Sequence, residues 1–131
     1  MKLEERHYTL FKDECNRWIE FFGFSDWEID FRFDDSMEMC AACAVNIAAH
    51  AAMLSLAVEP VIDYDVPDID EYVRQSAFHE VCELLLFEFE LTALNDKLPR
   101  KERAALVDAR RHGIVHRLSA IYKYAKGDQN G

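Results

Sequence analysis

The chain has no long hydrophobic run and few basic residues. Asp, Glu, Arg or His interrupts every apolar stretch before it reaches the roughly 20 residues that span a bilayer. Lys and Arg number 15 against 25 Asp and Glu, which gives the 131 residues a formal net charge of -10. That charge opposes binding to nucleic-acid phosphates and to anionic lipid surfaces, both of which attract basic side chains. We therefore expect no nucleic acid and no membrane among the partners.

Glycine and proline are also scarce, with four and three residues, and no segment is repeated or of low complexity. The length suits one hydrophobic core. We predict a single domain over residues 1–126 and a disordered tail over residues 127–131. The first residues, Met1–His7, contain no apolar signal region, so we expect a cytoplasmic protein.

The four cysteines give little sign of metal or redox chemistry. Cys15 and Cys82 lie in apolar helical patterns, where a free thiol packs as a small hydrophobic residue. Cys40 and Cys43 form a lone C-x-x-C motif. A zinc site built on such motifs needs a second pair, and a redox motif opens a helix, whereas the residues after Cys43 have a strand pattern. The motif is a weak signal for either chemistry.

The spacing of the apolar residues predicts a helix, three strands and two further helices. Gly23 is placed to end the first helix, and an Asp68–Glu71 capping box to begin the second. The expected elements are a helix over Glu4–Phe22, strands over Trp27–Phe33, Cys40–Ile47 and Ala52–Val58, and helices over residues 68–90 and 100–125. This order predicts an α+β fold, in which helices cover a small antiparallel or mixed sheet.

The second helix carries three ionisable residues on an apolar background. Residues 77–87 are hydrophobic nearly all round, as in the centre of a core, yet they include His79, Glu80 and Glu83. An ionised carboxylate that is buried without a partner lowers the free energy of unfolding by roughly several kcal/mol. His79 and Glu83 are four residues apart, so both leave the same helix face and are spaced to bind one metal ion. Glu80 lies at the flank of this pair.

This sequence, H-E-V-C-E over residues 79–83, resembles the helical H-E-x-x-H motif of zinc hydrolases, with glutamate at the second histidine. Most of the chain resembles the small zincin-like proteins, reduced zinc metallopeptidases that phages and prophages often carry. The similar segments are Trp27–Phe31, Met53–Leu56, Ala77–Glu80 and His112–Leu118. The resemblance implies a minimal zincin-like fold.

The resemblance also implies roles for individual residues. Zinc would be held by His79, Glu83 and a histidine of the last helix, which is His112 or, one turn later, His116. Glu80 would be the general base of a metal-dependent hydrolase, and more specifically of a peptidase. A peptide or protein substrate would pair with the edge of one strand. The substrate-binding residues on that strand would be Met53, Leu54, Ser55 and Leu56. A phage-encoded protein would act in the host cytoplasm.

Two other readings remain open at this level. The altered motif and the acidic surface suit a catalytically inactive zincin-like module that binds another protein. Alternatively, His79 and Glu83 form a structural hydrogen bond within the core, and His112 and His116 are surface residues of a basic helix.

Overall fold

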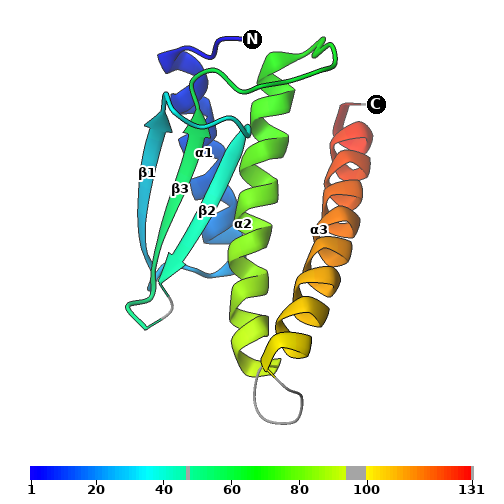
Figure 1. Cartoon of the computed structure of the whole chain (residues 1–131). Coiled ribbons are helices and arrows are strands. Elements are labelled where there is room, and N and C mark those ends of the chain that lie inside the picture. The colour runs from blue at the N-terminus through cyan, green and yellow to red at the C-terminus, as the bar shows by residue number, and fades with distance from the viewer. Residues whose placement is uncertain (47, 94–99, 131) are drawn as a thin grey trace.

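The computed structural model describes residues 1–46, 48–93 and 100–130, and its helices and strands follow the predicted order. The elements are α1 (Glu5–Phe22), β1 (Glu28–Asp34), β2 (Ala41–Asn46), β3 (Ala51–Ala57), α2 (Ile69–Ala93) and α3 (Arg100–Asn130). The fold is α+β, as predicted, with α2 between the sheet side and α3 (Figure 1). Within the described ranges, no helix is both long and apolar enough to cross a membrane.

The sheet is mixed, with strand order β1-β3-β2. The central strand β3 pairs in parallel with β1 and antiparallel with β2. Residues 52–57 are all apolar except Ser55, and five of these six side chains are buried. A strand with such a continuous apolar run takes the centre of a sheet because neighbours then cover it.

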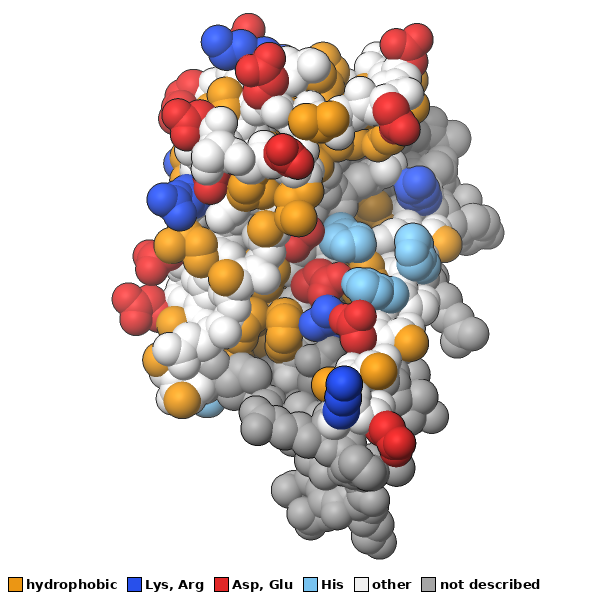
Figure 2. Space-filling view, viewed as in Figure 1, with side chains coloured by type: hydrophobic (Ala, Val, Ile, Leu, Met, Phe, Trp, Pro, Cys, Tyr) orange, Lys and Arg blue, Asp and Glu red, His pale blue; other side chains and the backbone are white. Residues whose placement is uncertain are grey.

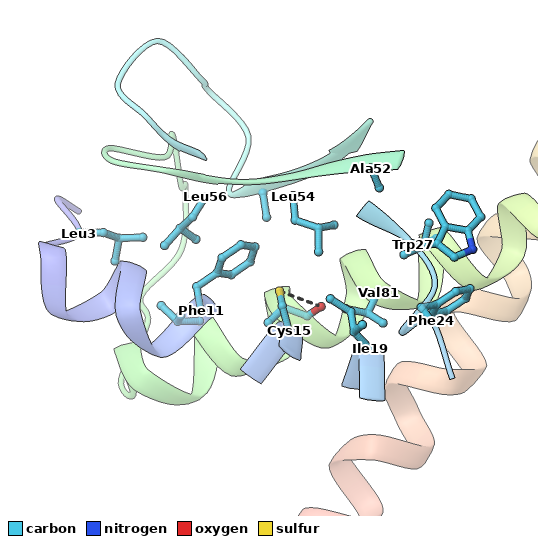
Figure 3. Packing of buried hydrophobic residues seen from close by; sticks show 14 residues of the cluster. Leu3, Phe11, Cys15, Ile19, Phe24, Trp27, Ala52, Leu54, Leu56 and Val81 are labelled. Carbon is cyan, nitrogen blue, oxygen red and sulfur yellow. Dashed lines mark hydrogen bonds between the residues drawn. The ribbon is translucent and has the colours of Figure 1, made fainter. Parts of the chain in front are cut away.

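Helix α2 contributes side chains to two hydrophobic clusters. On one face, Val81 and Leu84 join Phe11 and Ile19 of α1 and Leu54 of β3 in the main core (Figure 3). On another face, a smaller cluster seats α3 against α2. Its buried members are Phe78, Cys82, Leu86, Val115 and Tyr122. Burial on both sides explains why residues 77–87 of α2 are apolar nearly all round.

The start of α2 agrees with the sequence-based prediction, whereas α3 ends later than predicted. The backbone N–H of Glu71 donates to the Asp68 carboxylate at 3.0 Å, so Asp68 caps α2 as predicted. The predicted loop over Asn95–Pro99 lies outside the described residues. Residues 127–130, predicted as a disordered tail, continue helix α3. The single Gly127 does not end the helix, because its cost of about 1 kcal/mol is offset by the hydrogen bonds of the following residues.

Gly23 ends α1 in the left-handed region, with φ of 79°. Its backbone N–H donates to the Glu20 carbonyl, and the next N–H donates to the Ile19 carbonyl. A Cβ at position 23 would have no heavy atom within 4 Å, so only the backbone conformation disfavours a side chain there.

We expect Gly23→Ala to lower the free energy of unfolding by about 1–2 kcal/mol, the cost of left-handed backbone for an L-residue. Gly113 is the matched control, because it lies inside α3 and an added Cβ there is also free of contacts. Gly113→Ala should raise the free energy of unfolding by about 0.5–1 kcal/mol. Urea denaturation measures both, and effects of the same sign would contradict this account of the α1 terminus.

Candidate metal centre

His79 and Glu83 point the same way from α2, as their four-residue spacing predicts. The His79 Nε2 lies 3.5 Å from the Glu83 Oε1. The other Glu83 oxygen, Oε2, lies 3.3 Å from the Nε of Arg111, which belongs to α3. Arg111 also pairs with Asp108 one turn earlier, at 2.6 Å. Glu83 is therefore the point at which the polar residues of α2 and α3 meet.

The charges of this group reinforce one another. The hydrogen bond to His79 lowers the pKa of Glu83 against the opposing effect of burial, and Arg111 and His112 lower it further. The same hydrogen bond raises the pKa of His79, again against burial. In the absence of a metal ion, the pair favours a carboxylate beside an imidazolium. A metal ion would have to displace the imidazolium proton, so its binding would weaken as the pH falls.

The spacing of the two donor atoms fits a zinc ion. Ligand nitrogen and oxygen atoms lie about 2.0–2.2 Å from zinc, so two ligands at the tetrahedral angle are about 3.3–3.5 Å apart. The 3.5 Å between His79 Nε2 and Glu83 Oε1 agrees with that distance. This separation is compatible with two positions of a zinc site, and it is equally that of the ion pair which the two residues form with each other.

The third ligand predicted from α3 stays a prediction. His116 lines the same cavity as His79, and His112 lies close enough to Glu83 to lower its pKa. Figure 2 shows histidine side chains gathered beside acidic ones where α3 faces α2. Among the described side chains, no three His, Cys, Asp or Glu residues are grouped tightly enough to hold one ion. A complete site would need a histidine of α3 to approach the His79–Glu83 pair.

Glu80 is buried, with 8% of its surface exposed, and burial raises its pKa to about 7. Its charge raises the pKa values of the Cys15 thiol in α1 and of the Cys43 thiol in β2, the strand that contacts α2. A carboxyl group with a pKa near neutrality can both accept and donate a proton at physiological pH.

The expectation that a peptide pairs with Met53–Leu56 is wrong as to the strand. Both edges of β3 are occupied, by β1 and β2, and the side chains of Leu54, Ser55 and Leu56 are buried. The sequence marked these residues as a strand near the motif helix but did not show that the strand is central. β2, which contacts α2, is at the edge of the sheet.

Sequence reasoning missed Arg111 as a member of this site. Arg111 was one of several basic residues around the late histidines. It belongs to α3 and reaches Glu83 only through the packing of α3 on α2. The sequence did contain one signal for Arg111. A second carboxylate on an apolar helix, Glu83, needs a cation to compensate its charge, and a basic residue of the last helix could supply it.

Comparison of the chain with protein-family models, curated proteins and solved structures gives no match. The function therefore has to follow from the residues of this chain.

Because the folded protein holds the Glu80 proton up to about pH 7, whereas an ordinary glutamate loses it near 4.5, this group affects stability over that range. Its contribution is fully present below pH 4.5 and is lost as the pH rises through 7. We expect the metal-free wild type to lose about 3 kcal/mol relative to Glu80→Gln between pH 4.5 and 8. Urea unfolding with chelator present measures this difference. Parallel pH profiles of the two proteins would contradict the raised pKa.

Proposed function

We propose that this protein is a zincin-like, metal-dependent hydrolase that cleaves peptide bonds. The observation that supports this most is the His79–Glu83 pair, whose donor atoms have the separation of two zinc ligands, with a buried glutamate one residue after His79. His112 or His116 would supply the third ligand, and zinc is the metal we propose. The four free thiols suit a reducing compartment, so we propose the cytoplasm, or the host cytoplasm for a phage-encoded protein.

Each residue has a defined part in this proposal. His79 and Glu83 would hold the ion, which when bound supplies a Lewis acid for the scissile carbonyl and lowers the pKa of water. The Glu80 carboxylate would accept a proton from the attacking water and donate it to the leaving amine. Burial favours this role, because it brings the pKa of Glu80 to about 7.

The substrate would bind as an extended peptide along β2. Of the described strands β2 and β1 are at the edges of the sheet, and β2 is the one that contacts α2. Its alanine-rich sequence, AACAVN, offers small side chains over which another backbone can approach. Main-chain hydrogen bonds to an open strand edge are a common means of holding peptides.

A second candidate is a catalytically inactive relative that binds another protein. The observation that favours it is Arg111, whose Nε lies 3.3 Å from Glu83 Oε2. A fixed cation beside a metal-binding carboxylate opposes the approach of a second cation. In this case the polar group on α2 would be a network of ion pairs between α2 and α3.

Glu80→Gln should reduce peptide cleavage on the order of 10²–10⁴-fold, the scale of general acid–base catalysis, because the amide keeps the shape and cannot accept the proton. A chelator-sensitive assay on an unfolded protein substrate, at matched zinc content, measures the effect. Glu20→Gln is the control, because Glu20 is an exposed glutamate of α1. Equal cleavage by wild type and Glu80→Gln would exclude Glu80 as the base, and no cleavage by the wild type would favour the binding module.

Glu83→His would restore the H-E-x-x-H pattern. We expect its zinc affinity to rise above that of the wild type, because imidazole is a good zinc ligand and the substitution also removes the ion pair with Arg111. Competition with a chromophoric chelator measures the affinity, and circular dichroism checks that the variant is folded. Weaker or unchanged zinc binding by a folded variant would count against a metal ion shared by positions 79 and 83.

A further inference from the structure

A cavity of about 390 Å³ opens beside His79, between α2 and α3. Its aromatic walls include Tyr72 and Phe78 from α2 and Tyr122 from α3. His116 and Lys123 of α3 also line it. The volume is in the range of cavities that bind small ligands.

The charge of the cavity differs from that of the protein. The chain as a whole carries a net charge of -10, yet the described lining residues include Lys123 and two histidines and no Asp or Glu. Three carboxylates contact lining residues from outside the cavity wall: Glu71 accepts from Gln75, Glu83 pairs with His79, and Glu14 accepts from Tyr122. Lys123 is exposed, so its ammonium group is accessible from solvent. A cationic group in the same lining as aromatic walls favours a ligand with a negative group and an apolar part.

The walls of the cavity are held in place by contacts behind them. The Phe78 and Tyr122 rings stack with centroids 4.5 Å apart. The Tyr122 hydroxyl donates to the buried carboxylate of Glu14 at 3.2 Å, and the Trp18 Nε1 donates to the same oxygen at 3.2 Å. These contacts link α1 to α3 and preform one side of the cavity, which reduces the ordering cost of binding.

We propose that this cavity binds a carboxylate-bearing residue of a peptide, with Lys123 as the counter-charge and the aromatic walls around its side chain. As a substrate site the cavity rests on the function proposed above, because His79 is both a lining residue and a zinc ligand of that proposal. The peptide residue would then lie next to the bond to be cleaved. The carboxylate belongs either to the C-terminus of the peptide or to an Asp or Glu side chain.

Binding to the metal-free protein tests this proposal separately from hydrolysis. Trp18 reports on the cavity, because its ring lies 4.6 Å from Phe78 and 5.5 Å from Tyr122 between centroids. The probes are acetyl-Ala-Phe with a free carboxylate, its C-terminal amide, and acetyl-Ala-Glu-amide. Tryptophan fluorescence and calorimetry, with chelator present, measure their affinities. We expect at least one carboxylate probe to bind about tenfold or more tightly than the acetyl-Ala-Phe amide, the scale of one charged hydrogen bond.

Lys123→Gln should remove that preference and leave the binding of acetyl-Ala-Phe-amide unchanged, whereas Lys123→Arg should keep the preference. Lys101→Gln is the matched control, because it removes the same charge from an exposed lysine at the other end of α3. Preference for the free acid assigns the site to a peptide C-terminus, and preference for the glutamyl amide assigns it to an acidic side chain.

The proposal is overturned if no probe binds, if acid and amides bind equally, or if Lys101→Gln and Lys123→Gln have equal effects. Lys123-dependent binding by a protein that neither binds zinc nor cleaves peptides would leave the carboxylate site in place and remove the hydrolase proposal. Zinc-dependent cleavage with no carboxylate preference would do the reverse.

Discussion

The burial of α2 on two sides is the constraint on which the rest of the structure depends. One side of the helix closes the main core with α1 and the sheet, and another seats α3. Between these apolar faces the helix still carries His79, Glu80 and Glu83. The structure accommodates them in two ways: Glu83 is compensated by His79 and Arg111, and Glu80 has a pKa raised to about 7 by burial.

Only the second arrangement costs stability at neutral pH, because burial penalises the charged form of Glu80. The lowered pKa of Glu83 and the raised pKa of His79 mean that the fold favours the charged forms of that pair. A hydrophobic residue at position 80 would avoid the pH-dependent penalty of its carboxyl group, and the apolar sequence around it shows that such residues suit the helix. The presence of three ionisable groups within residues 79–83 of α2 is the physical reason for proposing a chemical role there. The role that we propose is metal binding by His79 and Glu83, whose nearest donor atoms are 3.5 Å apart.

Much of this fold could be predicted from the sequence, because the helices and strands have regular apolar spacing and clear ends such as Gly23 and Asp68. The central position of β3 in the sheet could not be predicted, because an alanine-rich sequence does not indicate whether one or both edges of the strand are paired. The four-residue spacing alone predicted that His79 and Glu83 project from the same side of α2. The proximity of Arg111 to Glu83 could not be predicted, because it depends on how α3 packs against α2. The choice between His112 and His116 as the proposed third ligand depends on the same packing, because both residues belong to α3.

The most direct test of the central claim is the zinc content of the purified protein after equilibrium dialysis, compared with that of His79→Ala and Glu83→Ala. Circular dichroism and thermal unfolding establish that each variant is folded. If the polar group on α2 is a metal site, the wild type should bind one zinc ion per chain and both folded variants should lose it. A wild type that binds no zinc, or variants that keep it, would contradict the metal site and leave the His79–Glu83–Arg111 group as an ion-pair network between α2 and α3.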